Sequence, residues 1–518
     1  MANEKKYTVT TPNYETTLEV WKELTADTSE SERIPARPVS VSNERASNPR
    51  NTEYWLTDEE AKELRQDPRV QSVEQLETLA LKKSAFQSGN FSKAFSSADE
   101  EDIVNWGLIR HIQNTDTFNG NDLPSGSPTY DYVLDGTGVD VVIVDSGIQP
   151  DHPDFHDADG VSRVRQIDWF TESGVSGSMP TDFYTDFDGH GTQCASIVAG
   201  KVNGWAKNAD IYAIKLDGLQ GASDPNGGIS IADTFDCILG WHNNKNNGRP
   251  TVINNSWGLV VYWNTDTEEL AFDTEFTNTT YAITGGSYRG TPWTGGTFDN
   301  AKGHVGAVAG SSNIRQMPYR SASIDADVQT LANANVVLVN AAGNEYQKID
   351  VVGGVDYDNY VAATGLSDYY YHRGTSPFSP FPEGFEVPAM AVNNISGEFG
   401  TVFSNKGPAT PVYAAGESIL AANIFGFVYY GNTGNFYYSV SGTSFAAPQI
   451  AGMAALLLQM HPDWTPQQVT KWFVDNAAKD QLRDTGLDDD YTANFSLLAG
   501  ENNVAFFPNA GQRPFEIS

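Results

Sequence analysis

The chain has 518 residues, of which 39% are hydrophobic and 19% are charged, a composition that predicts a globular protein and argues against wholesale disorder. Its 66 acidic residues outnumber its 32 basic residues, which gives a formal net charge of -34. So acidic a surface repels phosphate backbones and excludes nucleic acid as an expected partner. The length suffices for one large α/β domain and a smaller one.

Residues 1–80 are rich in charged side chains and predict a small α+β unit. We expect a helix over Tyr14–Leu24. A second helix should begin with Thr57 or Asp58 as its N-cap, because acidic residues fill the first turn that follows. Val70–Val73 alternates like a short strand.

Residues 81–104 are polar and Ser-rich, which predicts a linker. Residues 105–518 predict one long α/β domain. In that domain apolar runs alternate with helical patterns, which indicates a parallel sheet with helices on both faces. The expected strands are Val139–Val144, Ile211–Leu216, Val252–Asn254 and Val336–Asn340, and the expected helices are Gly191–Ala199, Ile231–Asn243 and Ser444–Met460.

Three short motifs place an acid, a base and a hydroxyl at the ends of these elements. Asp145 ends a strand in Val-Asp-Ser-Gly-Ile, and His190 precedes a helix in Asp-Gly-His-Gly-Thr. Ser444 begins the last long helix in Ser-Gly-Thr-Ser-Phe-Ala-Ala-Pro. Each motif alone has an ordinary structural explanation as a turn, a loop histidine or a helix cap. Together they indicate a hydrolase with a nucleophile, a base and an orienting acid.

A fourth motif, Ala-Ala-Gly-Asn-Glu, follows an apolar strand and contains Asn344. A side-chain amide at this position can donate a hydrogen bond to the oxyanion of a tetrahedral intermediate. An ordinary Gly-Asn turn is the structural alternative.

The four motifs resemble those of the subtilisin-like serine proteases (peptidase family S8), whose order along the chain is also Asp, His, Ser. The resemblance covers most of residues 106–480. It implies the family's three-layer α/β fold and hydrolysis of protein or peptide substrates through an acyl-enzyme, with no cofactor for the chemistry. It also implies Asp145 as the orienting acid, His190 as the general base, Ser444 as the nucleophile and Asn344 as the oxyanion donor.

Further segments resemble the edges of the family's substrate cleft. Asn-Ser-Trp-Gly is similar to the strand that pairs with an extended substrate, and a Gly-Gly pair resembles the opposite edge. The substrate-binding residues implied are Ser256, Trp257, Gly258, Gly227, Gly228 and Gly343.

The two cysteines are too few for a disulfide-dense scaffold, and we expect Cys194 and Cys237 to be free, buried thiols. Cys194 lies four residues after His190, on the same helix face. This spacing resembles the proteinase K branch of the family. That branch usually carries a second histidine where this chain has Gln193.

Residues 56–77 resemble the second half of the family's inhibitor-type propeptide. Such a unit assists folding and blocks the cleft until it is cut, so the implied partner of the peptidase domain is its own N-terminal segment. We expect processing between Glu77 and Val104. An accessory domain of another kind is the alternative.

The chain departs from compact family members by two long stretches, near 260–325 and 350–388, which we interpret as insertions near the cleft. Structural calcium is an option, because Asp154 has the spacing of a calcium carboxylate in some relatives. The loop at 200–208 that should complete that site is short, so the metal stays unassigned.

A different class of function stays open. The chain is also consistent with a non-catalytic structural or binding component, for example of a virus particle, built on the same fold. No long apolar core of a signal peptide and no run of about 18 apolar residues is visible. The localisation of the protein therefore stays open, and an extracellular location and association with a virus particle are the two options. A metallohydrolase is disfavoured because the sequence lacks His-Glu-x-x-His.

Overall fold

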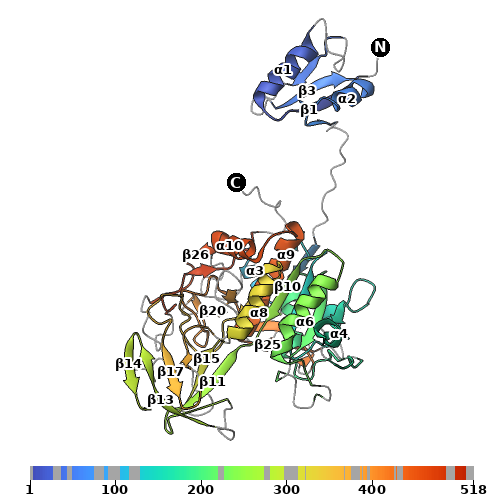
Figure 1. The fold of residues 1–518 in the computed structure, drawn as a ribbon. Coiled ribbons are helices and arrows are strands. Elements are labelled where there is room, and N and C mark those ends of the chain that lie inside the picture. Colours follow the sequence, from blue (N-terminus) through green and yellow to red (C-terminus); the bar gives the residue numbers. More distant parts are fainter. Residues whose placement is uncertain are drawn as a thin grey trace. The chain divides into compact units, whose positions relative to one another are not determined.

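Figure 1 shows a computed structural model of residues 1–518. The chain divides into two compact units, Met1–Ala85 and Phe86–Ser518. The structure describes residues 4–26, 37–43, 50–74, 87–90, 105–115, 129–174, 176–181, 183–216, 218–219, 224, 227–272, 280–296, 313–320, 322–366, 368–374, 385–387, 389–393, 397–424, 427–428, 436–485 and 496–508. Most of the predicted linker, and with it the expected processing region, lies outside these residues.

The first unit is an antiparallel sheet of order β2-β3-β1-β4 with two helices, as predicted for a small α+β unit. Thr57 is the N-cap of the second helix. Its hydroxyl accepts from the amide of Glu60 at 3.2 Å, and the Glu60 carboxylate accepts from the amide of Thr57 at 2.8 Å. The elements are β1 (Lys5–Thr10), α1 (Tyr14–Thr25), β2 (Val41–Asn43), β3 (Asn51–Leu56), α2 (Asp58–Leu64) and β4 (Ser72–Glu74).

This unit has a hydrophobic core of its own. One face of α1 contributes Val20 and Leu24, and α2 contributes Ala61 and Leu64. These side chains pack with apolar residues of the sheet such as Tyr54, and all five are almost fully buried.

The second unit is built on a parallel sheet of order β19-β16-β10-β7-β9-β8. The four strands predicted from apolar runs all belong to it. The strands are β7 (Asp140–Asp145), β8 (Val164–Gln166), β9 (Asp210–Lys215), β10 (Thr251–Asn255), β16 (Val337–Ala341) and β19 (Phe385–Val387).

Side chains alternate between two cores along the strands, because successive residues of a strand point to opposite faces. In β7, Val141 and Ile143 join a core with α5 and α9, whereas Val142 and Val144 join a core with α6 and α8. The predicted three-layer α/β architecture is therefore confirmed (Figure 1). These helices are α5 (His190–Ala199), α6 (Ile231–Asn244), α8 (Ala322–Asn333) and α9 (Thr443–Met460).

The chain between β10 and the last predicted helix carries a second, antiparallel sheet of order β15-β11-β12-β13-β17-β18, in which β14 also pairs with β13. Its strands come from both stretches interpreted as insertions, so the two stretches share one sheet (Figure 1). The strands are β11 (Leu259–Asn264), β12 (Glu269–Ala271), β13 (Tyr281–Tyr288), β14 (Thr291–Thr294), β15 (Ile314–Tyr319), β17 (Tyr360–Ala363) and β18 (Tyr369–Tyr370).

The other elements of the second unit are short, apart from α10. Among them β5 pairs with β6, which places residues 87–90 of the predicted linker in a strand. These elements are β5 (Gln87–Asn90), α3 (Gly107–Arg110), β6 (Thr129–Tyr132), η3 (Pro153–Phe155), α4 (Trp169–Ser173), β20 (Ala389–Asn393), β21 (Gly397–Gly400), β22 (Ala414–Ala415), β23 (Ile419–Asn423), β24 (Phe427–Val428), β25 (Phe436–Val440), α10 (Pro466–Asn476), β26 (Ala478–Lys479) and β27 (Asn503–Val504).

The parallel sheet brings distant motifs to one edge. The strands β7, β10 and β16 are parallel neighbours, so the chain leaves all three at the same edge of the sheet. Asp145 ends β7, Ser256 follows β10 and Asn344 lies just beyond β16. This is the edge at which open α/β sheets bind ligands. Among the described helices, none has the length and hydropathy required to span a bilayer.

Candidate active site

Asp145 and His190 are joined by a hydrogen bond at this edge. Asp145 is 1% exposed, and its Oδ1 accepts from His190 Nδ1 at 2.8 Å and from the amide of Ser146 at 2.8 Å. Because the partner is a carboxylate, the proton of the neutral imidazole lies on Nδ1. The other ring nitrogen, Nε2, then carries the lone pair that a general base needs.

The carboxylate also sets the proton affinity of His190. Burial by itself would lower the pKa of His190, but the negative charge of Asp145 and its hydrogen bond to the imidazole raise that pKa by more than burial lowers it. Cys194 also raises the pKa of His190, with a smaller effect. The pKa of His190 is therefore held well above its ordinary value of 6.5. The imidazole accepts a proton more readily than a free histidine does, as expected of a base in acyl transfer.

Cys194 lies beneath this pair. Its Sγ is 3.9 Å from His190 Nδ1 and donates to the backbone carbonyl of Ser444 at 3.5 Å. Burial raises the pKa of the Cys194 thiol, which keeps it protonated. Cys194 and Cys237 are both free and buried, so the prediction of free, buried thiols is confirmed.

Ser444 is the second residue of α9 and is only partly buried. Its hydroxyl donates to the backbone carbonyl of Ser256 at 3.0 Å. In return the Ser256 hydroxyl donates to the backbone carbonyl of Ser444 at 2.7 Å and accepts from Asn254 Nδ2 at 3.0 Å. The ring centroid of the next residue, Phe445, is 5.5 Å from that of His190. Ser444 is thus fixed at the start of its helix, close to the histidine.

Asn344 is held against the start of the same helix. Its Oδ1 accepts from the amide of Thr443 at 3.0 Å and from the Thr443 hydroxyl at 2.9 Å. An amide nitrogen can only donate, so this contact fixes which atom of the Asn344 side chain is the oxygen. The amide of Gly343 donates to the Thr443 hydroxyl at 3.0 Å. With Oδ1 engaged, Asn344 presents Nδ2 as a donor on an exposed side chain.

A family model described as the subtilase family matches residues 136–493, which is more than half of the chain. The chain belongs to the subtilase family. This subtilase is 28% identical over 428 residues to a cuticle-degrading protease of Metarhizium anisopliae, covering 82% of this chain and 75% of the relative. It is 24% identical over 431 residues to an extracellular serine proteinase of a Thermus species, covering 83% of this chain and 72% of that relative.

A solved structure of a cold-adapted subtilisin-like serine proteinase is 20% identical to this subtilase, with a TM-score of 0.46, and the match covers 77% of this chain and 97% of that one. The family and its named relatives establish this subtilase as a subtilisin-like serine endopeptidase.

The residues implied as substrate-binding lie around the same edge, and not all of their side chains are accessible. The Trp257 indole donates to the carbonyl of Val144 at 3.0 Å and is buried in the core, so this side chain is not free to contact a ligand. Gly258 is exposed and leads into β11. Gly227 and Gly228 are partly exposed. They precede Ile229, which forms a β-bridge with Leu216, the residue that follows β9.

Three polar residues of this region were not singled out from the sequence. Thr443 orients the Asn344 side chain by a hydrogen bond, and Asn254 donates a hydrogen bond to the Ser256 hydroxyl. Both residues lie within or beside motifs identified from the sequence. Asp186 is a buried carboxylate four residues before His190, in a polar loop. No spacing or composition signal separates it from the other acids of that loop.

The residues around Asp154 do not fit a calcium ion. The Asp154 carboxylate accepts from the Ser196 hydroxyl at 2.6 Å and from the amide of Val202 at 2.7 Å. The Lys207 ammonium donates to the loop carbonyls of Lys201 and Val202, at 3.1 and 2.9 Å. A protein cation therefore uses carbonyl oxygens that a metal would need.

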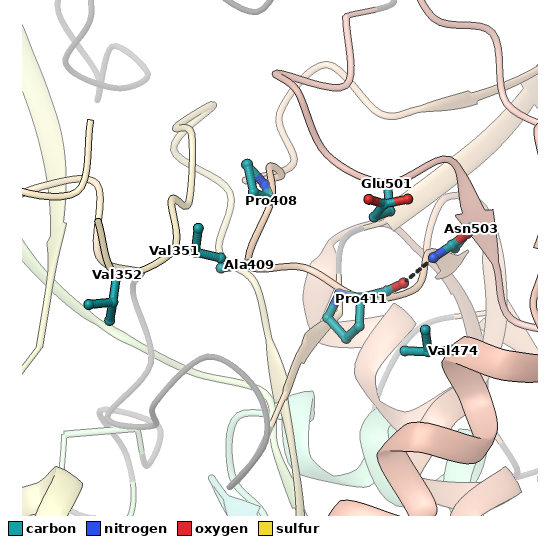
Figure 2. Close-up of a pocket in the computed structure, with 8 residues that line it drawn as sticks. All are labelled: Val351, Val352, Pro408, Ala409, Pro411, Val474, Glu501 and Asn503. Atoms are coloured by element: carbon teal, nitrogen blue, oxygen red, sulfur yellow. Dashed lines mark hydrogen bonds between the residues drawn. The ribbon is translucent and has the colours of Figure 1, made fainter. Parts of the chain in front are cut away.

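An apolar pocket of about 380 Å³ lies apart from these groups (Figure 2). None of the residues discussed above lines it, and the amide of Asn503 is engaged with the carbonyl of Pro411 at 3.0 Å. It is lined by Val351, Val352, Pro408, Ala409, Pro411, Val474, Glu501 and Asn503. It is therefore separate from the edge at which Asp145, His190 and Ser444 meet.

Proposed function

We propose that this subtilase cleaves peptide bonds in proteins with Asp145, His190 and Ser444 as its catalytic triad. The observation that carries the proposal is the 2.8 Å hydrogen bond from His190 Nδ1 to the buried Asp145, at the sheet edge where Ser444 lies in the first turn of α9. The relatives are named as proteases, which act on proteins, and this supports the proposed substrate class.

The reaction begins when the Ser444 hydroxyl turns from the Ser256 carbonyl to His190 Nε2. As Oγ attacks the scissile carbonyl carbon, its proton passes to Nε2, and the negative Asp145 stabilises the imidazolium that forms. The substrate carbonyl oxygen becomes an oxyanion, which accepts from Asn344 Nδ2 near the positive end of α9. His190 then gives the proton to the leaving amine, and an acyl-enzyme on Ser444 remains. Water then attacks the ester carbonyl while His190 takes a proton from it. The bond from the acyl carbon to Ser444 Oγ breaks, and His190 returns the proton to Oγ as the carboxylic acid product leaves.

The N-terminal unit acts, in this proposal, as an intramolecular inhibitor that is removed by processing between Glu77 and Val104. Its independent core and α+β fold support such a role, as does its resemblance to the propeptides of the family. The name of the extracellular Thermus relative supports action outside the cell.

A serine-directed fluorophosphonate is expected to label the processed protein at Ser444, because the probe reacts only with a serine activated by a neighbouring base. Mass spectrometry of the labelled peptide identifies the site. Labelling should disappear in Ser444→Ala and persist in Ser441→Ala, whose hydroxyl lies three residues away on the same motif. A folded, processed wild type that resists the probe would contradict the proposed triad.

Replacing Asn344 by alanine is expected to lower kcat about 10²–10³-fold while KM changes little, because the lost donor acts on the oxyanion of the transition state. Thr443→Val removes a hydroxyl donor to Asn344 Oδ1 but keeps the backbone donor, so a smaller loss is expected. Steady-state kinetics on a peptide substrate measure both. A kcat unchanged in Asn344→Ala would remove Asn344 from the mechanism.

A further inference from the structure

Asp186 is a buried carboxylate that the proposed reaction does not use. It is 3% exposed, yet it accepts hydrogen bonds from five donors in the two segments that carry Asp145 and His190. Its Oδ1 accepts from Ser146 Oγ at 3.0 Å and from the backbone amides of Asp188 and Gly189, at 3.0 and 2.8 Å. Its other oxygen, Oδ2, accepts from the backbone amide of Thr192 at 3.0 Å and from the Thr192 hydroxyl at 2.6 Å.

The partners of Asp186 also connect the two segments directly. Ser146, next to Asp145, accepts from the amide of Gly191 at 2.9 Å while its hydroxyl donates to Asp186. The Thr192 hydroxyl donates to Asp186 and accepts from the amide of Gln149 at 3.0 Å. The chain after Asp145 is therefore linked twice to the first turn of the histidine helix.

Two glycines allow this close approach. A Cβ on Gly191 would lie 2.1 Å from the carbonyl oxygen of Gly147 and 3.0 Å from the Asp145 Cβ. Gly147 has a φ of +115°, and a Cβ there would lie 2.6 Å from the carbonyl oxygen of Tyr184. The segments are thus in backbone contact, where a small displacement of either one changes the distance between the reacting side chains.

We propose that Asp186 is a positioning residue, which together with Ser146 and Thr192 forms a buried clip that holds His190 against Asp145. The inference rests on the proposed function, because it assigns roles within the same site. Without the clip, the histidine helix and the Asp145 turn keep their folds but lose their fixed separation. The hydrogen bond from His190 Nδ1 to Asp145 then lengthens for part of the time.

This clip has a signature that a purely structural role lacks. The proximity of Asp145 holds the pKa of His190 high against burial, so a looser pair should lower that pKa. Besides Asp145, the titratable group that contacts the His190 ring among the described residues is the Cys194 thiol on its own helix; the exposed Asp188 accepts from the His190 backbone amide at 3.3 Å. Neither is altered by a change at Thr192 or Ser146.

The decisive variant is Thr192→Val, which keeps the shape of the side chain and the net charge but removes the hydroxyl between Asp186 and Gln149. In the full chain carrying Ser444→Ala, an NMR titration of labelled histidines, assigned with His190→Gln, reports the pKa of His190 without any turnover. We expect this pKa to fall toward 6.5 or below in Thr192→Val and in Ser146→Ala, and to return in Thr192→Ser. In the active enzyme, kcat should fall about 10–10²-fold in the first two variants.

Asp154→Asn is the matched control, because Asp154 is as buried as Asp186 and accepts from Ser196 on the same helix α5, at the end away from His190. It should lower thermal stability and leave the pKa of His190 unchanged. If Thr192→Val and Ser146→Ala also lose stability without moving that pKa, the clip is only structural and the inference fails. Failure of the proposed function appears elsewhere, as a wild type that the fluorophosphonate does not label.

Discussion

Replacing Ser444 by alanine is expected to lower kcat about 10⁶-fold, because the change removes the hydroxyl on which the proposed acyl-enzyme forms. The same change should leave residues 1–518 uncut. The wild type, by contrast, should cut itself between Glu77 and Val104 and shorten by the N-terminal unit. Gel mobility, intact mass and N-terminal sequencing of both purified proteins measure the difference.

Ser441→Ala serves as the control for this comparison. Its exposed hydroxyl accepts from the amide of Ser418 at 3.0 Å, so the variant loses a hydroxyl of the same motif without touching His190. It should process like the wild type. A wild type that stays at full length and turns over no peptide would instead favour the non-catalytic structural or binding component.

Asp145→Asn is expected to lower kcat about 10⁴-fold, the cost typical of an amide in place of the orienting carboxylate. The amide can donate to His190 Nδ1, which places the imidazole proton on Nε2, where the Ser444 proton must arrive. It also removes the negative charge that stabilises the imidazolium.

The pH dependence gives this prediction a second measurement. His190 must be neutral to accept a proton, and its pKa lies well above 6.5 in the wild type, so kcat/KM should rise as the pH increases through that raised value. In Asp145→Asn the charge is gone but burial remains, and burial lowers the pKa of His190. The rising limb of the plot of kcat/KM against pH should therefore move to lower pH, while the plateau of kcat/KM falls.

Asp151→Asn is the matched control, because it makes the same charge change at an exposed position six residues further along the chain. It should leave both the plateau and the rising limb in place. A rising limb that stays in place in Asp145→Asn would show that Asp145 does not set the pKa of His190, contrary to the proposed role.

Much of the fold follows from local patterns in the sequence. Apolar runs predicted β7, β9, β10 and β16, because strands buried on both faces have little tolerance for polar residues. The capping signals at Thr57 located the start of α2, because they satisfy amides that a helix leaves free within one turn. The segments with Asp145, His190, Ser444 and Asn344 were identified in the same way, from short motifs at the ends of strands and helices.

Other features depend on contacts between residues that are far apart in the chain. Strands from both predicted insertions pair across the sheet, as β13 does with β17, and no local pattern encodes that pairing. Asp154 had the spacing of a calcium ligand, but its partners Ser196 and Val202 became visible only in the folded chain.

The sequence by itself thus determined which residue types stand at the edge of the sheet, because periodicity and capping are local. Only the tertiary structure decided how they are oriented. Thr443 fixes the direction of the Asn344 amide, and Asp186 links the segments of Asp145 and His190. The physical reason is that a hydrogen bond depends on distance and angle to a specific atom, which spacing along the chain does not set.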